Sequence, residues 1–224
     1  GVGVLRGERP HVPDEIHLVV YPQGGQDDYS ALLHEAGHAE HFAHVPADLP
    51  FEYRLLGDNA VTEAFAFLFD HLMLNRAWLA RYVGFTECDE YVRFATVSDL
   101  FYLRRYAAKL AYETEFHVRD GSLDGLAEVY RRRLGQALMI DVPAQSYLAD
   151  IDAGLYVASY LRAWMLEGAL RMMLQDRFGW EWFTDPGAGA FVKRLWGLGQ
   201  KFTAEQLLLK NDGGMLGTDQ LVHH

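Results

Sequence analysis

One short stretch of the sequence has residue types and spacing that suit a metal ion. The segment His34-Glu35-Ala36-Gly37-His38 places two histidines one helical turn apart. Because successive residues of an α-helix turn by about 100°, His34 and His38 project from the same face and present two imidazole nitrogens to one ion. Glu35 projects beside them, where its carboxylate is placed to take a proton from an attacking water. This H-E-x-x-H pattern is typical of zinc hydrolases; the alternative is a helical face that carries histidines by chance.

A third ligand is expected because two histidines alone do not complete a protein zinc site. Glu63 lies twenty-five residues after His38, at the front of a segment whose run 64–69 is apolar throughout. A carboxylate inside such a helix is costly unless it is paired or bound to a metal. The sequence therefore predicts one zinc ion held by His34, His38 and Glu63.

Two further polar residues repeat at the same spacing. Asp70 follows Glu63 by seven residues, only about 20° from the same helical face, and we expect it to accept a hydrogen bond from a ligand histidine. His41 follows His34 by seven residues, about 10 Å along the axis, so both cannot bind one zinc. His41 is predicted either to line the cleft or to be a buried partner of the site.

The segment 34–41, His-Glu-Ala-Gly-His-Ala-Glu-His, resembles the H-E-F-G-H-x-x-H signature of the thimet oligopeptidase and oligoendopeptidase F metallopeptidases. In that family the third zinc ligand and a further acidic residue stand where this sequence has Glu63 and Asp70, while Ala36 replaces the usual phenylalanine. The resemblance is specific over about 16–74 and weaker over about 147–173. It implies a mostly helical zinc peptidase that acts on short peptides, lacking the helical half that precedes the catalytic helices in longer members.

Tyr156 and Tyr160, four residues apart, resemble the tyrosine-rich helix of that family. There a phenol donates a hydrogen bond to the oxyanion of the tetrahedral intermediate, a charge that needs a donor in addition to the metal. The family's histidine just before these tyrosines has no counterpart, since no histidine lies between His117 and His223. The alternative is that both tyrosines are core residues.

The elements that would position these residues are mostly helices. A strand over 16–21 is expected before the helix of the H-E-x-x-H segment. It is either an ordinary strand or, as the family resemblance implies, one that pairs with substrate backbone. Caps, apolar periodicity and breakers predict helices over about 27–44, 58–74, 86–118, 122–139, 152–178, 185–199 and from 203 onward. The predicted fold is mainly α, one zincin-type catalytic domain over 1–222, with a short strand or small sheet next to the metal helix.

Composition narrows the functional class. The net charge of −11 argues against a nucleic-acid partner, which would need a basic surface. A single cysteine, Cys88, excludes an internal disulfide framework and suits a reducing compartment. No secretory signal and no apolar run of membrane-spanning length is evident, so we expect no membrane partner and a cytoplasmic location. His223-His224 is typical of an affinity-tag remnant, and the sequence makes no prediction of oligomeric state.

The predicted function is zinc-dependent hydrolysis of peptide bonds in short peptides, by an endopeptidase. Two alternatives stay open. One is an exopeptidase with the same ligand set; the other is a non-catalytic zinc-binding fragment of a larger peptidase.

Overall fold

The computed structural model describes residues 2–5 and 12–222, so the predicted tag remnant at 223–224 lies outside the described residues. Contacts divide the chain into two compact units, one built from 1–92 with 162–224 and the other from 93–161. Two of the long helices run across the boundaries between these units, and the single catalytic domain expected over 1–222 stays a prediction. Those helices are α5 (Asp89–His117) and α7 (Tyr156–Phe178). Each unit therefore has a core of its own.

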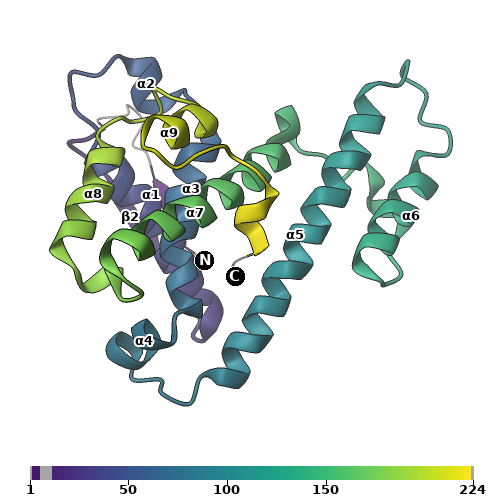
Figure 1. Ribbon diagram of the computed structural model, residues 1–224. Helices are drawn as coiled ribbons and strands as arrows, with labels where there is room; N and C mark the ends of the chain where they lie inside the picture. The colour runs from purple at the N-terminus through teal and green to yellow at the C-terminus, as the bar shows by residue number, and fades with distance from the viewer. Residues whose placement is uncertain (1, 6–11, 223–224) are drawn as a thin grey trace. The chain divides into compact units, whose positions relative to one another are not determined.

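Figure 1 shows the helices of the first unit lying together. They share one large cluster of buried apolar side chains. This cluster joins buried residues of α3, of α7 from Ala163 onward, and of the last two α-helices. A short helix over 51–55 lies in the gap between the helices expected over 27–44 and 58–74. The elements besides α7 are α1 (Gln26–Ala43), α2 (Phe51–Leu55), α3 (Asn59–Asp70), α4 (Arg76–Trp78), α8 (Pro186–Trp196) and α9 (Ala204–Lys210). The mainly helical fold class is confirmed.

Helix α3 is the central element of the first unit. Its run 64–66 is fully buried, as the apolar sequence predicts. Asp58 caps it by accepting a hydrogen bond from the Ala60 amide at 3.1 Å. Arg162 of α7 donates to both Asp58 oxygens, at 2.9 and 2.6 Å, and also to Glu205 of α9. The amino end of α3, which carries Glu63, is thereby tied to two other helices.

A small sheet lies beside α1. Strand β2 (His17–Val20) pairs antiparallel with β1 (Val2–Leu5), with Val2 opposite Val20, and both strands contact α1. Within the described residues this is a two-stranded sheet, and all four residues of β2 are exposed. The predicted strand and its place next to the helix of the H-E-x-x-H segment are confirmed; its pairing with substrate stays a prediction.

The second unit has a separate core. Helix α6 (Leu126–Leu138) packs on α5 through Tyr112, Tyr130 and Leu134 (Figure 1). Lys109 is buried there and lies 2.6 Å from the Asp152 carboxylate, which satisfies its charge. The helix expected over 122–139 begins only at Leu126, because Gly125 before it has the left-handed conformation.

Other helix boundaries also differ from the sequence prediction, and α8 ends at Trp196 where a helix to about 199 was expected. The helix expected from 58 to 74 ends at Asp70 and continues as a 3-10 turn over His71–Leu74. Helix α7 begins at Tyr156 and not at 152, because Gly154 and Leu155 have positive φ and interrupt it. The helix expected from about 86 begins at Asp89.

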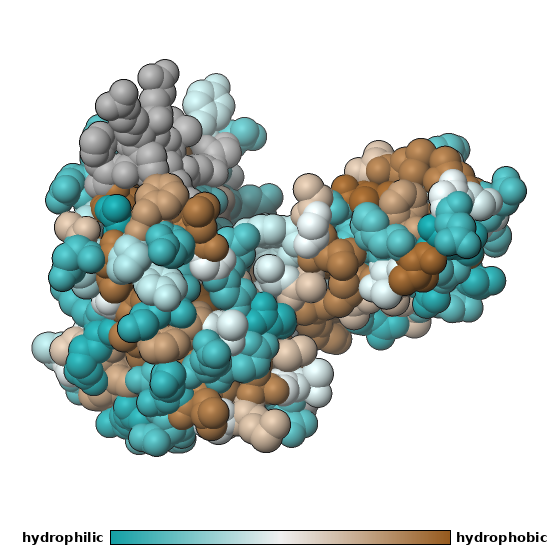
Figure 2. Space-filling model, turned by 90° about the horizontal axis from the view of Figure 1, so that it is seen from above, coloured by the Kyte–Doolittle hydropathy of each residue, from teal (hydrophilic) through white to brown (hydrophobic). Residues whose placement is uncertain are grey.

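The surface of both units mixes hydrophilic and hydrophobic side chains (Figure 2). Within the described part of the chain, none of the helices combines the length and apolar character that crossing a membrane requires.

Candidate metal centre

Helix α1 carries the H-E-x-x-H segment, and a turn fixes its start. The Asp28 carboxylate accepts hydrogen bonds from the backbone amides of Gln23 and Gly24, both at 2.5 Å. Asp27 and Asp28 lie in the first turn, where negative charge is favourable against the helix dipole. The predicted helix is therefore present, one residue longer at its start and one shorter at its end.

Helices α1 and α3 lie against each other in opposite directions. Ser30, near the start of α1, bonds to Asp70 at the end of α3, while His38 bonds to Thr62 near the start of α3. Their closest approach is at Gly37: a Cβ atom there would lie 2.6 Å from the Cα of Ala66 and 2.6 Å from the carbonyl oxygen of Phe65. The absence of a side chain at this position lets the two backbones come close enough to share a site.

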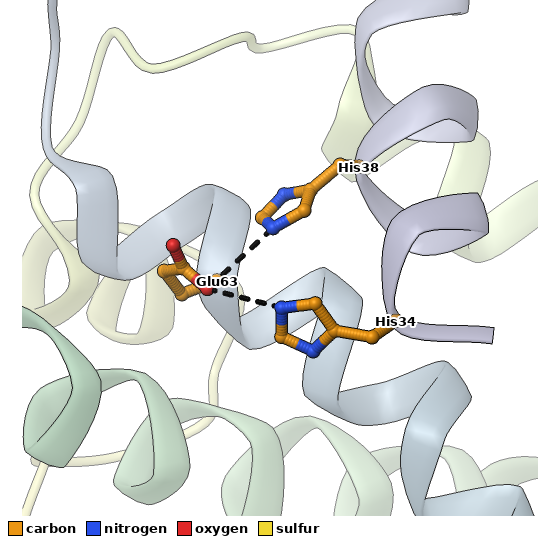
Figure 3. Close-up of side chains that lie close together, drawn as sticks. All are labelled: His34, His38 and Glu63. Carbon is orange, nitrogen blue, oxygen red and sulfur yellow. Dashed lines mark ion pairs between the residues drawn. The ribbon is translucent and has the colours of Figure 1, made fainter. Parts of the chain in front are cut away.

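The predicted ligands meet across this helix pair. Oε2 of Glu63 lies 3.4 Å from Nε2 of His34 and 3.5 Å from Nε2 of His38, and the two imidazoles project toward it from α1 (Figure 3). One donor atom of each residue lies within 4.8 Å of the other two. Zinc–nitrogen and zinc–oxygen bonds of about 2.1 Å in a tetrahedron place neighbouring donors about 3.4 Å apart. The donor types and the two distances from Glu63 to the imidazoles are therefore compatible with one metal ion, zinc among the candidates.

The three predicted ligands, His34, His38 and Glu63, form a triad whose members differ in burial and charge. Glu63 is only 5% exposed, while the His34 and His38 side chains keep 20% and 13% of their surface. Burial lowers the pKa of His34, but the hydrogen bond and charge of Glu63, with smaller contributions from Asp70 and Glu35, outweigh it, so that the pKa is raised. In the metal-free protein Glu63 thus favours a protonated His34, and a metal ion would take the place of that proton.

The predicted base, Glu35, is half-buried on α1 beside the triad. Its charge acts on the His34 imidazole. The structure thus keeps this carboxylate near the predicted site, and its role as a base stays a prediction.

Asp70 has a different partner from the one expected. Its Oδ1 accepts a hydrogen bond from the Ser30 hydroxyl at 2.5 Å, and its charge favours protonation of His34. Burial raises the pKa of Asp70, against the opposing effects of Ser30 and His34. The reason for the different partner is the antiparallel arrangement, which sets the end of α3 against the first turns of α1. Asp70 therefore acts on the site by charge.

His41 is fully buried, which favours the second of the two predicted roles. Its ring centroid lies 4.9 Å from that of Phe65 and 5.3 Å from that of Phe42. It therefore packs as a buried residue in the interface between α1 and α3, and its part in the site stays a prediction.

Tyr156 and Tyr160 belong to the second unit, whereas the triad belongs to the first. The Tyr160 ring stacks on Tyr106 with centroids 5.5 Å apart and meets Tyr156 edge-on at 5.0 Å. Both tyrosines are half-buried. Their oxyanion role stays a prediction.

Several residues near the triad were not anticipated. Phe67 lies edge-on to His34 at 5.2 Å and stacks on Trp164 of α7 at 5.1 Å, which gives the site an aromatic wall. Behind Asp70, the buried Glu167 accepts a hydrogen bond from Arg171 at 2.9 Å. Burial raises the pKa of Glu167, and the charge of Asp70 adds to the effect. Thr62 stands next to Glu63 and Ser30 one helical turn before His34, and this spacing is the sequence signal that could have found them.

Comparison with known proteins adds no family: the chain matches no protein-family model, no curated protein and no solved structure.

Proposed function

We propose that this chain is a zinc-dependent peptidase that hydrolyses peptide bonds in short peptides. The observation that carries the proposal is the Glu63 carboxylate placed 3.4 and 3.5 Å from the two H-E-x-x-H imidazoles, at the donor spacing of a tetrahedral zinc site. His34, His38 and Glu63 would hold the ion. Bound there, zinc supplies Lewis-acid activation of a water and of the scissile carbonyl.

The chain's own residues then move the proton. Glu35 accepts a proton from the attacking water as the water oxygen bonds to the carbonyl carbon. When the carbon–nitrogen bond breaks, Glu35 gives that proton to the leaving amine, so the products are a carboxylic acid and an amine. Glu35 suits both steps because it returns to its starting carboxylate state after each turnover.

Two surrounding features support a peptide substrate. The partly exposed His34 and His38 leave an open side to the donor cluster, as a catalytic zinc site requires. Strand β2 lies next to α1 with exposed residues, and an exposed strand can pair with an extended peptide through its backbone. Such pairing reads the main chain and tolerates many side chains.

The test is cleavage of a mixed set of short peptides, analysed by mass spectrometry. We expect cleavage that 1,10-phenanthroline abolishes, that its non-chelating 1,7 isomer leaves intact, and that added zinc restores. Glu35→Gln serves as the control for contaminating proteases. Zinc binding without cleavage would contradict the peptidase proposal and support the non-catalytic alternative.

A second peptide set separates internal from terminal cleavage. Peptides acetylated at the amino end and amidated at the carboxyl end are resistant to most exopeptidases. Internal cuts in these capped peptides support an endopeptidase. Trimming that occurs only in the uncapped versions supports the exopeptidase alternative.

A further inference from the structure

Both nitrogens of the His38 ring have a contact on α3. Nε2 lies 3.5 Å from the Glu63 carboxylate, and Nδ1 lies 2.8 Å from the Thr62 hydroxyl oxygen. Thr62 and Glu63 are adjacent in sequence, so one turn of α3 contacts the ring at its metal-facing nitrogen and at its opposite nitrogen. His34 has no equivalent hydroxyl contact among the described hydrogen bonds.

We propose that Thr62 is a positioning residue that holds His38 in the ring orientation and tautomer needed for metal binding, through the contact between its hydroxyl and Nδ1. A neutral imidazole carries its proton on one nitrogen only, so a proton on Nδ1 leaves the Nε2 lone pair for the metal. The Thr62 oxygen accepts that Nδ1–H. This inference rests on the proposed zinc site.

The surroundings of Thr62 favour its contact with His38 over a contact with water. Thr62 is 3% exposed, so water does not compete well for His38 Nδ1. A helical threonine hydroxyl can donate its own hydrogen to the carbonyl of the preceding turn, which leaves its oxygen lone pairs for an incoming N–H. The β-branched side chain also has few rotamers in a helix, which limits the positions open to the oxygen.

In other metal-binding proteins, hydrogen-bond partners of ligand histidines have a measurable effect on metal affinity. Groups that accept a hydrogen bond from the far nitrogen of a ligand histidine fix its orientation, and their removal costs about 10- to 100-fold in metal affinity. In many metal sites a carboxylate accepts this hydrogen bond. Here Asp70 bonds to Ser30, and the Thr62 hydroxyl contacts the far nitrogen of His38 in its stead.

The test compares zinc affinity in Thr62→Val, Thr62→Ser and the wild-type chain, by competition with a chelating dye. Thr62→Val keeps the shape and removes the hydroxyl, and we expect about 10- to 100-fold weaker zinc binding. Thr62→Ser keeps the hydroxyl and should bind within about threefold of wild type, on the same reasoning. Thr114→Val, which removes a hydroxyl bonded to the Leu110 carbonyl in the second unit, is the matched control and should bind like wild type.

The outcomes separate this inference from the proposed function. Normal zinc binding in Thr62→Val overturns the role of Thr62 and leaves the zinc site standing. Absence of zinc binding in the wild-type chain overturns both.

A measurement on the unaltered protein covers the case in which Thr62→Val does not fold. In the zinc-loaded chain the Nδ1–H of His38 should give a proton resonance that exchanges slowly with water. Exchange as fast as that of a free imidazole would contradict the inference.

Discussion

Replacement of Gly37 by alanine tests whether the close approach of α1 and α3 builds the site. The added Cβ would lie 2.6 Å from the Ala66 Cα and from the Phe65 carbonyl oxygen, where ordinary contact begins at 3.4 Å. Both neighbours are backbone atoms, so no side chain can turn aside. The helices must therefore separate by about 0.8 Å, which exceeds the roughly 0.2 Å that metal–ligand distances tolerate.

The expected loss in the free energy of unfolding of Gly37→Ala is the difference between two opposing contributions. Overpacking a well-packed interface costs about 1–3 kcal/mol, and two backbone contacts place this case at the upper end. Alanine in place of a helical glycine stabilises the helix by about 1 kcal/mol. The net loss of about 2 kcal/mol corresponds to a fall in Tm of about 4–8 °C for a unit of this size. Zinc affinity should fall as well, because Glu63 moves away from both histidines.

The assay is thermal unfolding of the metal-free proteins together with zinc titration. Gly189→Ala is the matched control, because Gly189 lies within α8 and its Cβ would meet no atom within 4 Å. That variant should be unchanged or slightly more stable. A Gly37→Ala protein with wild-type Tm and zinc affinity would refute the reasoning.

Three further predictions concern the base, the oxyanion and acid stability. Glu35→Gln should keep zinc affinity and lose nearly all turnover, because an amide cannot accept the proton; near-normal peptide cleavage would refute Glu35 as the base. Tyr160→Phe should lower kcat about a hundredfold with little change in KM, whereas a core role predicts a lower Tm and unchanged turnover. The hydrogen bond from Arg162 lowers the pKa of Glu205 to about 2. Because this pKa is lower in the folded chain, the ionised Glu205 stabilises the fold above its ordinary pKa of about 4.5, and that stability is lost as pH falls toward 2. Glutamine cannot ionise, so the urea midpoint of Glu205→Gln should fall less steeply with decreasing pH below about 4.5 than that of wild type; an equal slope would refute the assignment.

The sequence predicted the helices and the ligand cluster because both depend on local patterns. Turn and cap signals delimit α1, and the apolar run around Glu63 marks a buried helix, whose carboxylate then needs a partner. Histidines one turn apart fix two donors on one face whatever surrounds them. These features need no knowledge of how distant segments pack.

What the sequence did not predict depends on helix packing. The partner of Asp70 follows from the antiparallel direction of α1 and α3, which spacing along α3 alone does not give. Gly37 looked like one position of a motif, and its role appears only when Ala66 is seen against it. The two compact units leave no mark in the sequence, because α5 and α7 are continuous helices whose patterns do not change at the boundary.

The most direct test of the central claim is the zinc content of the wild-type chain and of Glu63→Gln after dialysis against a weak chelator. Glutamine keeps the size of Glu63 and removes the charge that faces both imidazoles. The account predicts one zinc per wild-type chain and binding weaker by orders of magnitude in the variant, with both proteins folded. Full zinc occupancy in Glu63→Gln, or none in the wild type, would contradict it.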